Sequence, residues 1–116
     1  MGGRSDSSGG STSATSLEIS ISLTGKDGPT KLWTLNCPAG GTLPNAARAC
    51  TLLEQLDEPF APVPKDFACT EIYGGPEVAE VRGTFRGEPV DATFSRTNGC
   101  EIARWNRVRF LFPGVR

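Results

Sequence analysis

The chain has 116 residues, a formal net charge of −1, four cysteines and no histidine. Its length fits one domain, and its charge argues against an unspecific polyanion binder. No apolar run approaches the roughly 18 residues that a membrane span requires. Without histidine, the chain lacks the usual general base and the usual zinc ligand. We therefore expect a protein that is not an enzyme and that holds no metal or cofactor.

The N-terminal residues are mostly glycine and serine, which leave almost nothing apolar to bury. We expect residues 1–15 to be a flexible tether and residues 16–116 to form the folded domain. No signal peptide is visible, since Met1 leads straight into glycines, so we expect that an export signal was removed and Met1 added. The tether also resembles the start of a bacterial lipoprotein after its acylated cysteine. Two localisations therefore stay open: secreted, or lipid-anchored to the bacterial envelope.

Four cysteines in a short chain with no Cys-x-x-Cys pair favour disulfides over zinc. Disulfides imply an oxidising compartment, which agrees with export. The cysteines alone allow three pairings, and their spacing does not choose among them.

In the first half, residues 17–23 alternate apolar and polar side chains, which predicts a half-buried strand. Residues 31–36 follow a glycine- and proline-containing turn and predict the returning strand of a hairpin. Residues 46–56 carry alanine and leucine at helical spacing, with Asn45 as the candidate N-cap.

In the second half, residues 58–64 contain three prolines and predict a coil. Residues 77–86 and 90–94 alternate again, which predicts a second hairpin, and residues 101–106 suggest a short helical turn. A fifth strand is expected from the alternation of Val108, Phe110 and Phe112. The pattern predicts an α+β fold: a two-layer sandwich with a five-stranded antiparallel sheet, covered by one main helix and a short second helix.

Arginine is concentrated near the C-terminus, where seven lie between residues 82 and 116. Nucleic-acid binding is one interpretation of that excess. A solvated outer face of the last strands is the other, because several of these arginines alternate with apolar residues. We favour the second and expect no nucleic-acid partner.

Residues 68–76 form the most unusual stretch of the chain. A cysteine lies near one end, two glycines and a proline lie at the other, and nothing between them suits a core. The stretch predicts an extended loop pinned at both ends, suited to lying in a protease cleft as a substrate does.

Several short motifs recur in the order found in one known family. With the four cysteines, the chain resembles the bacterial subtilisin inhibitor-like family of the Streptomyces type over roughly residues 17–112. Besides the cysteines, the residues that carry the likeness are Leu35, Asn36, Gly41, Thr42, Leu43, Pro44, Ala49, Leu52, Leu53, Tyr73, Pro76, Gly83, Thr84, Phe85, Arg86, Gly87, Val90, Asn98, Glu101, Val108, Phe110 and Phe112.

The resemblance implies disulfides Cys37–Cys50 and Cys69–Cys100. It also implies inhibition of serine proteases through a substrate-like reactive loop, with the scissile bond between Glu71 and Ile72.

In that loop Glu71 would be the P1 residue, which enters the primary specificity (S1) pocket of the protease. Thr70 and Cys69 would be P2 and P3, and Ile72 and Tyr73 would be P1′ and P2′.

Two further residues are implicated as loop support. Cys100 would hold the loop through its disulfide, and Asn98 would either brace the loop through its side-chain amide or serve as an ordinary turn residue. The family also implies dimerisation through the sheet.

The sequence departs from the family at Glu71, where members usually carry a non-acidic residue. A carboxylate in an apolar S1 pocket loses its hydration without gaining a partner. Three interpretations remain open: a glutamate-preferring serine protease as target, loss of action on subtilisins, or a subtilisin-like protease with a wide, wet pocket. The chain between Tyr73 and Pro76 also looks one residue longer than is usual, and the first cysteine loop about two residues shorter.

The expected function is thus a secreted or envelope-tethered serine protease inhibitor. The alternative is a non-inhibitory envelope module that keeps the fold and binds another protein. The sequence leaves open the physiological protease, the oligomeric state and any second surface for a metalloprotease.

Overall fold

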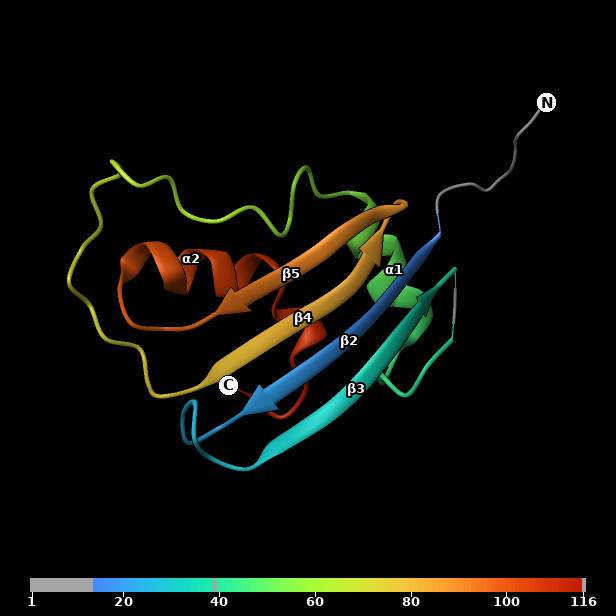
Figure 1. Cartoon of the computed structure of the whole chain (residues 1–116), viewed down its shortest axis with the longest axis horizontal. Coiled ribbons are helices and arrows are strands. Elements are labelled where there is room, and N and C mark those ends of the chain that lie inside the picture. Colours follow the sequence, from blue (N-terminus) through green and yellow to red (C-terminus); the bar gives the residue numbers. More distant parts are fainter. Residues whose placement is uncertain (1–13, 39, 116) are drawn as a thin grey trace.

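A four-stranded antiparallel sheet forms one layer of the structure (Figure 1). The computed structural model describes residues 14–38 and 40–115. The strands lie in the order β3-β2-β4-β5, so the two hairpins β2–β3 and β4–β5 meet along β2 and β4. Their bounds are β2 (Thr15–Ser22), β3 (Thr30–Cys37), β4 (Val78–Phe85) and β5 (Glu88–Phe94).

Alternation of apolar and polar residues determines which face of the sheet is buried. In β2, Leu17, Ile19 and Ile21 are all buried, while Glu18 between them is exposed. Leu35 of β3 lies opposite Leu17 and on the same face, because side chains of paired residues point the same way. The two predicted hairpins are therefore present, with their apolar face inward.

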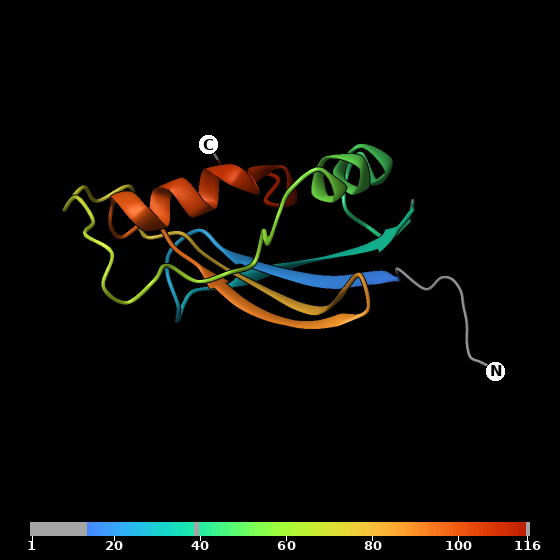
Figure 2. The same cartoon turned by 90° about the horizontal axis from the view of Figure 1, so that it is seen from above.

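Two helices cover the apolar face, and none of the described residues 14–38 and 40–115 forms a helix on the other face of the sheet (Figure 2). They are α1 (Ala46–Glu54) and α2 (Gly99–Arg107), and a 3-10 turn, η1 (Arg109–Leu111), follows α2. Leu53 of α1 and Trp105 of α2 are almost fully buried against the sheet. The α+β, two-layer class expected from the sequence is thus observed.

The two helices begin differently. Asn45 occupies the N-cap position of α1 in a left-handed conformation, but its side chain makes no capping hydrogen bond. Asn98 caps α2, because its Oδ1 accepts a hydrogen bond of 2.9 Å from the backbone N–H of Glu101.

The predicted fifth strand is wrong. The segment with Val108, Phe110 and Phe112 directly follows α2 and contains η1, and the sheet has four strands within the described residues. Burial follows a different spacing: Trp105, Val108 and Leu111 are all at most 1 % exposed. A spacing of three is helical, so this segment packs its apolar side chains as a helical extension of α2.

The expected tether of residues 1–15 lies mostly outside the described residues, and Thr15 already belongs to β2. Among the residues that the structure does describe, no helix is long and apolar enough to cross a membrane.

Candidate reactive-site loop

The loop of residues 68–76 extends from one end of the molecule, beyond the start of α2 (Figure 1). It contains neither helix nor strand, and residues 70–73 are all exposed. Ile72 and Tyr73 are 59 % and 66 % exposed, although both are large and apolar. Five such side chains are exposed in the described part of the chain, and Phe67 is a third one in or next to this loop. This concentration is typical of a contact surface.

The N-terminal side of the loop is attached to the start of α2. Cys69 forms a disulfide with Cys100, with 5.3 Å between their Cα atoms. One residue further on, the carbonyl of Thr70 accepts a hydrogen bond of 2.9 Å from the N–H of Gly99. The contact is close, because a Cβ at residue 99 would collide with Oγ1 of Thr70.

The C-terminal side of the loop is attached to the segment that follows β5. The N–H of Gly74 donates to the carbonyl of Arg96 at 2.6 Å. Gly74 also packs closely on Ile102 of α2, since a Cβ there would lie 3.0 Å from Cδ1 of Ile102. Residues 70 and 74 are thus both bonded to the backbone of residues 96–99, and three residues span the gap between them.

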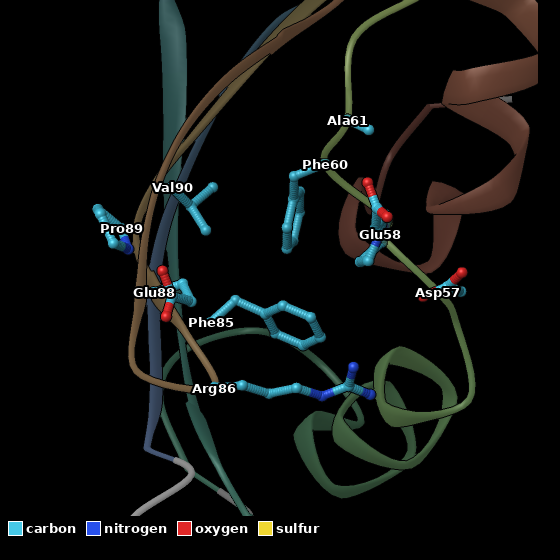
Figure 3. Close-up of a pocket in the computed structure, with 10 residues that line it drawn as sticks. Asp57, Glu58, Phe60, Ala61, Phe85, Arg86, Glu88, Pro89 and Val90 are labelled. Atoms are coloured by element: carbon cyan, nitrogen blue, oxygen red, sulfur yellow. The ribbon is translucent and has the colours of Figure 1, made fainter.

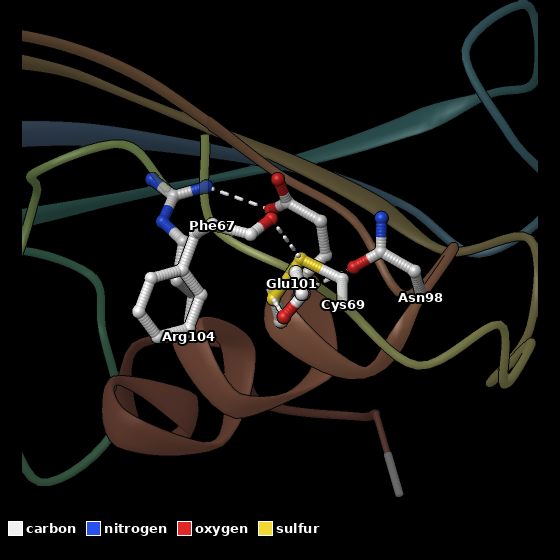
Figure 4. Close-up of a disulfide and its surroundings, with 7 residues drawn as sticks. Phe67, Cys69, Asn98, Glu101 and Arg104 are labelled. Atoms are coloured by element: carbon white, nitrogen blue, oxygen red, sulfur yellow. Dashed lines mark hydrogen bonds and ion pairs between the residues drawn. A yellow bond between two sulfur atoms is a disulfide. The ribbon is translucent and has the colours of Figure 1, made fainter. Parts of the chain in front are cut away.

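The support beneath the loop consists of the first turns of α2 (Figure 4). Asn98 uses its side-chain oxygen to cap this helix, and the neighbouring Gly99 then presents its N–H to the loop. Glu101 forms an ion pair of 2.8 Å with Arg104, whose Nη1 also donates to the carbonyl of Thr93 at 3.1 Å. The start of α2, to which the loop is bonded, is therefore itself held against β5 through Arg104.

The other cysteine pair lies away from the loop. The disulfide Cys37–Cys50 joins the end of β3 to α1, with 5.6 Å between the Cα atoms. Both disulfides have the pairing that the family resemblance implies.

A model of the subtilisin inhibitor-like family matches residues 11–98, which is most of the chain. The chain belongs to this family. A search of curated proteins gives no match. Members of the subtilisin inhibitor-like family are typically protease inhibitors rather than enzymes, and the two disulfides fit an extracellular protein. The match includes the loop and ends just before α2, which carries Cys100.

A concave region lies beside the β4–β5 turn of this subtilisin inhibitor-like domain (Figure 3), and that turn is at the opposite end of the sheet from the loop (Figure 1). It is a hollow of about 400 Å³ between the β4–β5 turn and the coil that follows α1. The rings of Phe60 and Phe85 meet inside it, edge to face, with 5.4 Å between centroids. Arg86 lines it but donates through Nη2 to the carbonyl of Glu54 at 2.6 Å. The hollow is thus a site where the coil packs onto the sheet.

Sequence reasoning picked out Cys69, Asn98 and Cys100, but missed Arg96 and Gly99. A glycine directly after an asparagine and before a helical pattern is a usable signal of close backbone approach. Arg96 gave no signal, because no motif or spacing in the sequence connects it with the loop residue Gly74, to which its backbone carbonyl is bonded.

Proposed function

We propose that this member of the subtilisin inhibitor-like family inhibits a serine protease through the loop of residues 68–76, with Glu71–Ile72 as the scissile bond. One observation supports this proposal: residues 70–73 are exposed, while backbone hydrogen bonds at Thr70 and Gly74 hold both sides of the loop to residues 96–99. Thr70 and Cys69 then serve as P2 and P3, and Tyr73 as P2′.

The attachments explain why such a loop inhibits instead of being degraded. A flexible substrate loses conformational freedom when it binds, whereas a loop already held at Thr70 and Gly74 loses less, so more of the contact energy appears as affinity. If the protease cuts Glu71–Ile72, both new ends stay attached and the bond re-forms. Asn98 supports the loop indirectly, because its hydrogen bond to the N–H of Glu101 fixes the start of α2, where Gly99 bonds the loop.

The P1 residue restricts the target. Glu71 is exposed, so its carboxylate is hydrated in the free protein. An apolar S1 pocket would remove that hydration without a partner, at a cost of several kcal/mol. A pocket with cationic or N–H donor groups restores hydrogen bonds to the carboxylate. We therefore propose a glutamate-preferring serine protease as the target.

We further propose that the protein acts outside the cell, either secreted or held at the bacterial envelope by its N-terminal segment. The outer face of the sheet is the proposed surface for a homodimer. No helix of the described residues covers that face, and it carries charged side chains such as Arg82. Nη2 of Arg82 lies 3.2 Å from Oε1 of Glu80, and its Nε lies 3.4 Å from Oδ1 of Asp91.

A protease panel with one matched pair of variants tests this function. The wild-type protein should inhibit a glutamyl-specific serine protease stoichiometrically and an apolar-pocket subtilisin only weakly. The variant Glu71→Met should reverse the order, with affinity for the subtilisin rising by well over about tenfold, because the charge no longer has to be desolvated. Glu88→Met, an exposed glutamate at the far end of β5, is the control and should leave both inhibition constants unchanged.

Equal inhibition of the subtilisin by wild type and Glu71→Met would show that the loop is not the contact surface. Failure to inhibit any serine protease would favour the alternative, a non-inhibitory protein-binding module on the same fold.

A further inference from the structure

The corner formed by residues 74–77 is attached to Arg96 at two points. The N–H of Gly74 donates to the carbonyl of Arg96 at 2.6 Å. Three residues later, Oε1 of Glu77 lies 3.4 Å from Nη1 of the same arginine. Between them Gly75 has a φ of +136°, and a Cβ there would collide with Oε1 of Glu77. The corner thus folds back so that its backbone and its carboxylate both contact one residue.

The Arg96–Glu77 ion pair is less exposed to solvent than the ion pair between β4 and β5, Arg82–Asp91. The side chains of Arg96 and Glu77 are each 20 % exposed, whereas those of Arg82 and Asp91 are 63 % and 78 % exposed. Nε of Arg96 and Oε1 of Glu77 are buried and form no hydrogen bond within the described residues. Each charge therefore depends mainly on the other, and removing one leaves the second poorly solvated.

The guanidinium group of Arg96 also contacts the core residue Trp105. Its Cζ lies 6.0 Å from the ring centroid of Trp105, which is 1 % exposed. A cation near an aromatic ring is attracted to it, so Arg96 is fixed between the core and the corner.

We propose that Arg96 and Glu77 are positioning residues that hold the primed side of the scissile bond, so that the Ile72 amine released by cleavage stays close to the Glu71 acyl group. This inference rests on the proposed function and adds a specific device to it. Ile72 lies only two residues before Gly74, so fixing the corner limits the volume that the new amine can reach.

The chemistry that the pair assists is reversible acyl transfer. The protease's serine oxygen adds to the Glu71 carbonyl, the amide bond to Ile72 breaks, and the serine proton passes to the Ile72 nitrogen. In the reverse step the Ile72 amine attacks the ester, the amide re-forms, and the proton returns to the serine. Water can attack the same ester instead, which releases the serine hydroxyl and leaves a Glu71 carboxyl group on the cleaved protein. A clamped amine favours re-formation of the amide over this hydrolysis and lowers the fraction of cleaved protein at equilibrium.

Hydrogen exchange of two amides provides the first test. In Glu77→Gln, the Gly74 amide should exchange about tenfold faster, because loss of a partly buried charge partner weakens the corner. The Gly99 amide, which bonds the other side of the loop, should change by less than about twofold. Arg96→Lys, which keeps a charge partner, should retain more Gly74 protection than Arg96→Gln. Asp91→Asn breaks an exposed pair of the same 3.4 Å separation and should alter neither amide.

Equal acceleration at Gly74 and Gly99 would indicate general destabilisation and overturn the proposal, as would no change at Gly74.

The second test measures the ratio of cleaved to intact protein after long incubation with a catalytic amount of the glutamyl-specific protease. Glu77→Gln should raise the ratio about tenfold over wild type, while Asp91→Asn leaves it unchanged. A normal wild-type ratio that Glu77→Gln does not alter removes the clamp alone. A wild-type protein that never re-forms the bond removes the proposed function and the clamp with it.

Discussion

At the scale of single residues, the loop depends on glycines placed where a side chain has no room. Gly99 touches Thr70, Gly74 touches Ile102, and Gly75 adopts a φ of +136°. Only a glycine adopts that last conformation without strain. These contacts bring the loop close enough to its support for backbone hydrogen bonds at both ends.

Gly99→Ala should separate inhibition from stability. A Cβ there would collide with Oγ1 of Thr70 and push the loop away from α2. Because alanine is favoured over glycine in a helix, the midpoint of urea unfolding should change little, while the inhibition constant should rise about tenfold. Gly40→Ala, whose Cβ would meet only ordinary contacts, is the matched control for both measurements. A Gly99→Ala variant that inhibits as wild type does would contradict the role assigned to this contact.

Residue chemistry also decides what the sequence could predict about the site. The chemistry of the cysteines and of Glu71 follows from their residue type alone, and the family resemblance located them in the sequence. Arg96 and Glu77 lie nineteen positions apart (96 − 77) on either side of the second hairpin. Only the pairing of β4 with β5 brings them together, and no spacing rule predicts such a contact.

At the scale of elements, three arginines fix the end of α1 and the coil between α1 and the loop. Their side chains donate to backbone carbonyls: Arg86 to Glu54 at 2.6 Å, Arg107 to Asp57 at 3.0 Å, and Arg104 to Ala61 at 3.0 Å. The last carbonyls of a helix and those of a proline-containing coil lack backbone partners, and these side chains donate hydrogen bonds to them. Part of the arginine excess therefore has a structural use that neither sequence interpretation anticipated.

The same scale explains why one element was predicted wrongly. Alternation in Val108, Phe110 and Phe112 resembles a strand, but Trp105, Val108 and Leu111 also recur every third residue. Over so few residues the two periods overlap, and packing decides between them. In the structure the rings of Trp105 and Phe112 pack against each other at a tilt of 48°, with 4.6 Å between centroids, a contact that the turn η1 makes possible. The longer alternation in β2 had no such competitor and was predicted correctly.

The two disulfides should make unequal contributions to function. Replacing Cys37 and Cys50 with serine should lower the free energy of unfolding by about 2–4 kcal/mol and leave inhibition intact at temperatures where the protein is folded. Replacing Cys69 and Cys100 should instead convert the protein into a substrate, because the freed loop end diffuses away after cleavage. Urea unfolding and a time course of protease inhibition distinguish the two variants. Similar inhibition by both would show that the disulfide at the loop is not needed to hold it.

At the scale of the whole molecule, the layers separate stability from recognition. The core lies between the sheet and the two helices, while the loop extends from one end and contributes little to it. The aromatic rings of Phe94, Trp105 and Phe112 sit between the layers and connect β5 to α2. Residues 95–98 connect β5 to α2, and residues 96 and 99 bond the loop. Because both elements are fixed in the core, the positions to which the loop is bonded are fixed as well.

The central claim is that a protease can cut this loop without destroying the inhibitor, and mass spectrometry of the incubated protein tests it most directly. With a catalytic amount of a glutamyl-specific serine protease, we expect one cleavage, between Glu71 and Ile72. The product should gain the mass of one water, stay joined through Cys69–Cys100 and still inhibit. Cutting at other glutamates first, or loss of inhibition once Glu71–Ile72 is cut, would contradict the account.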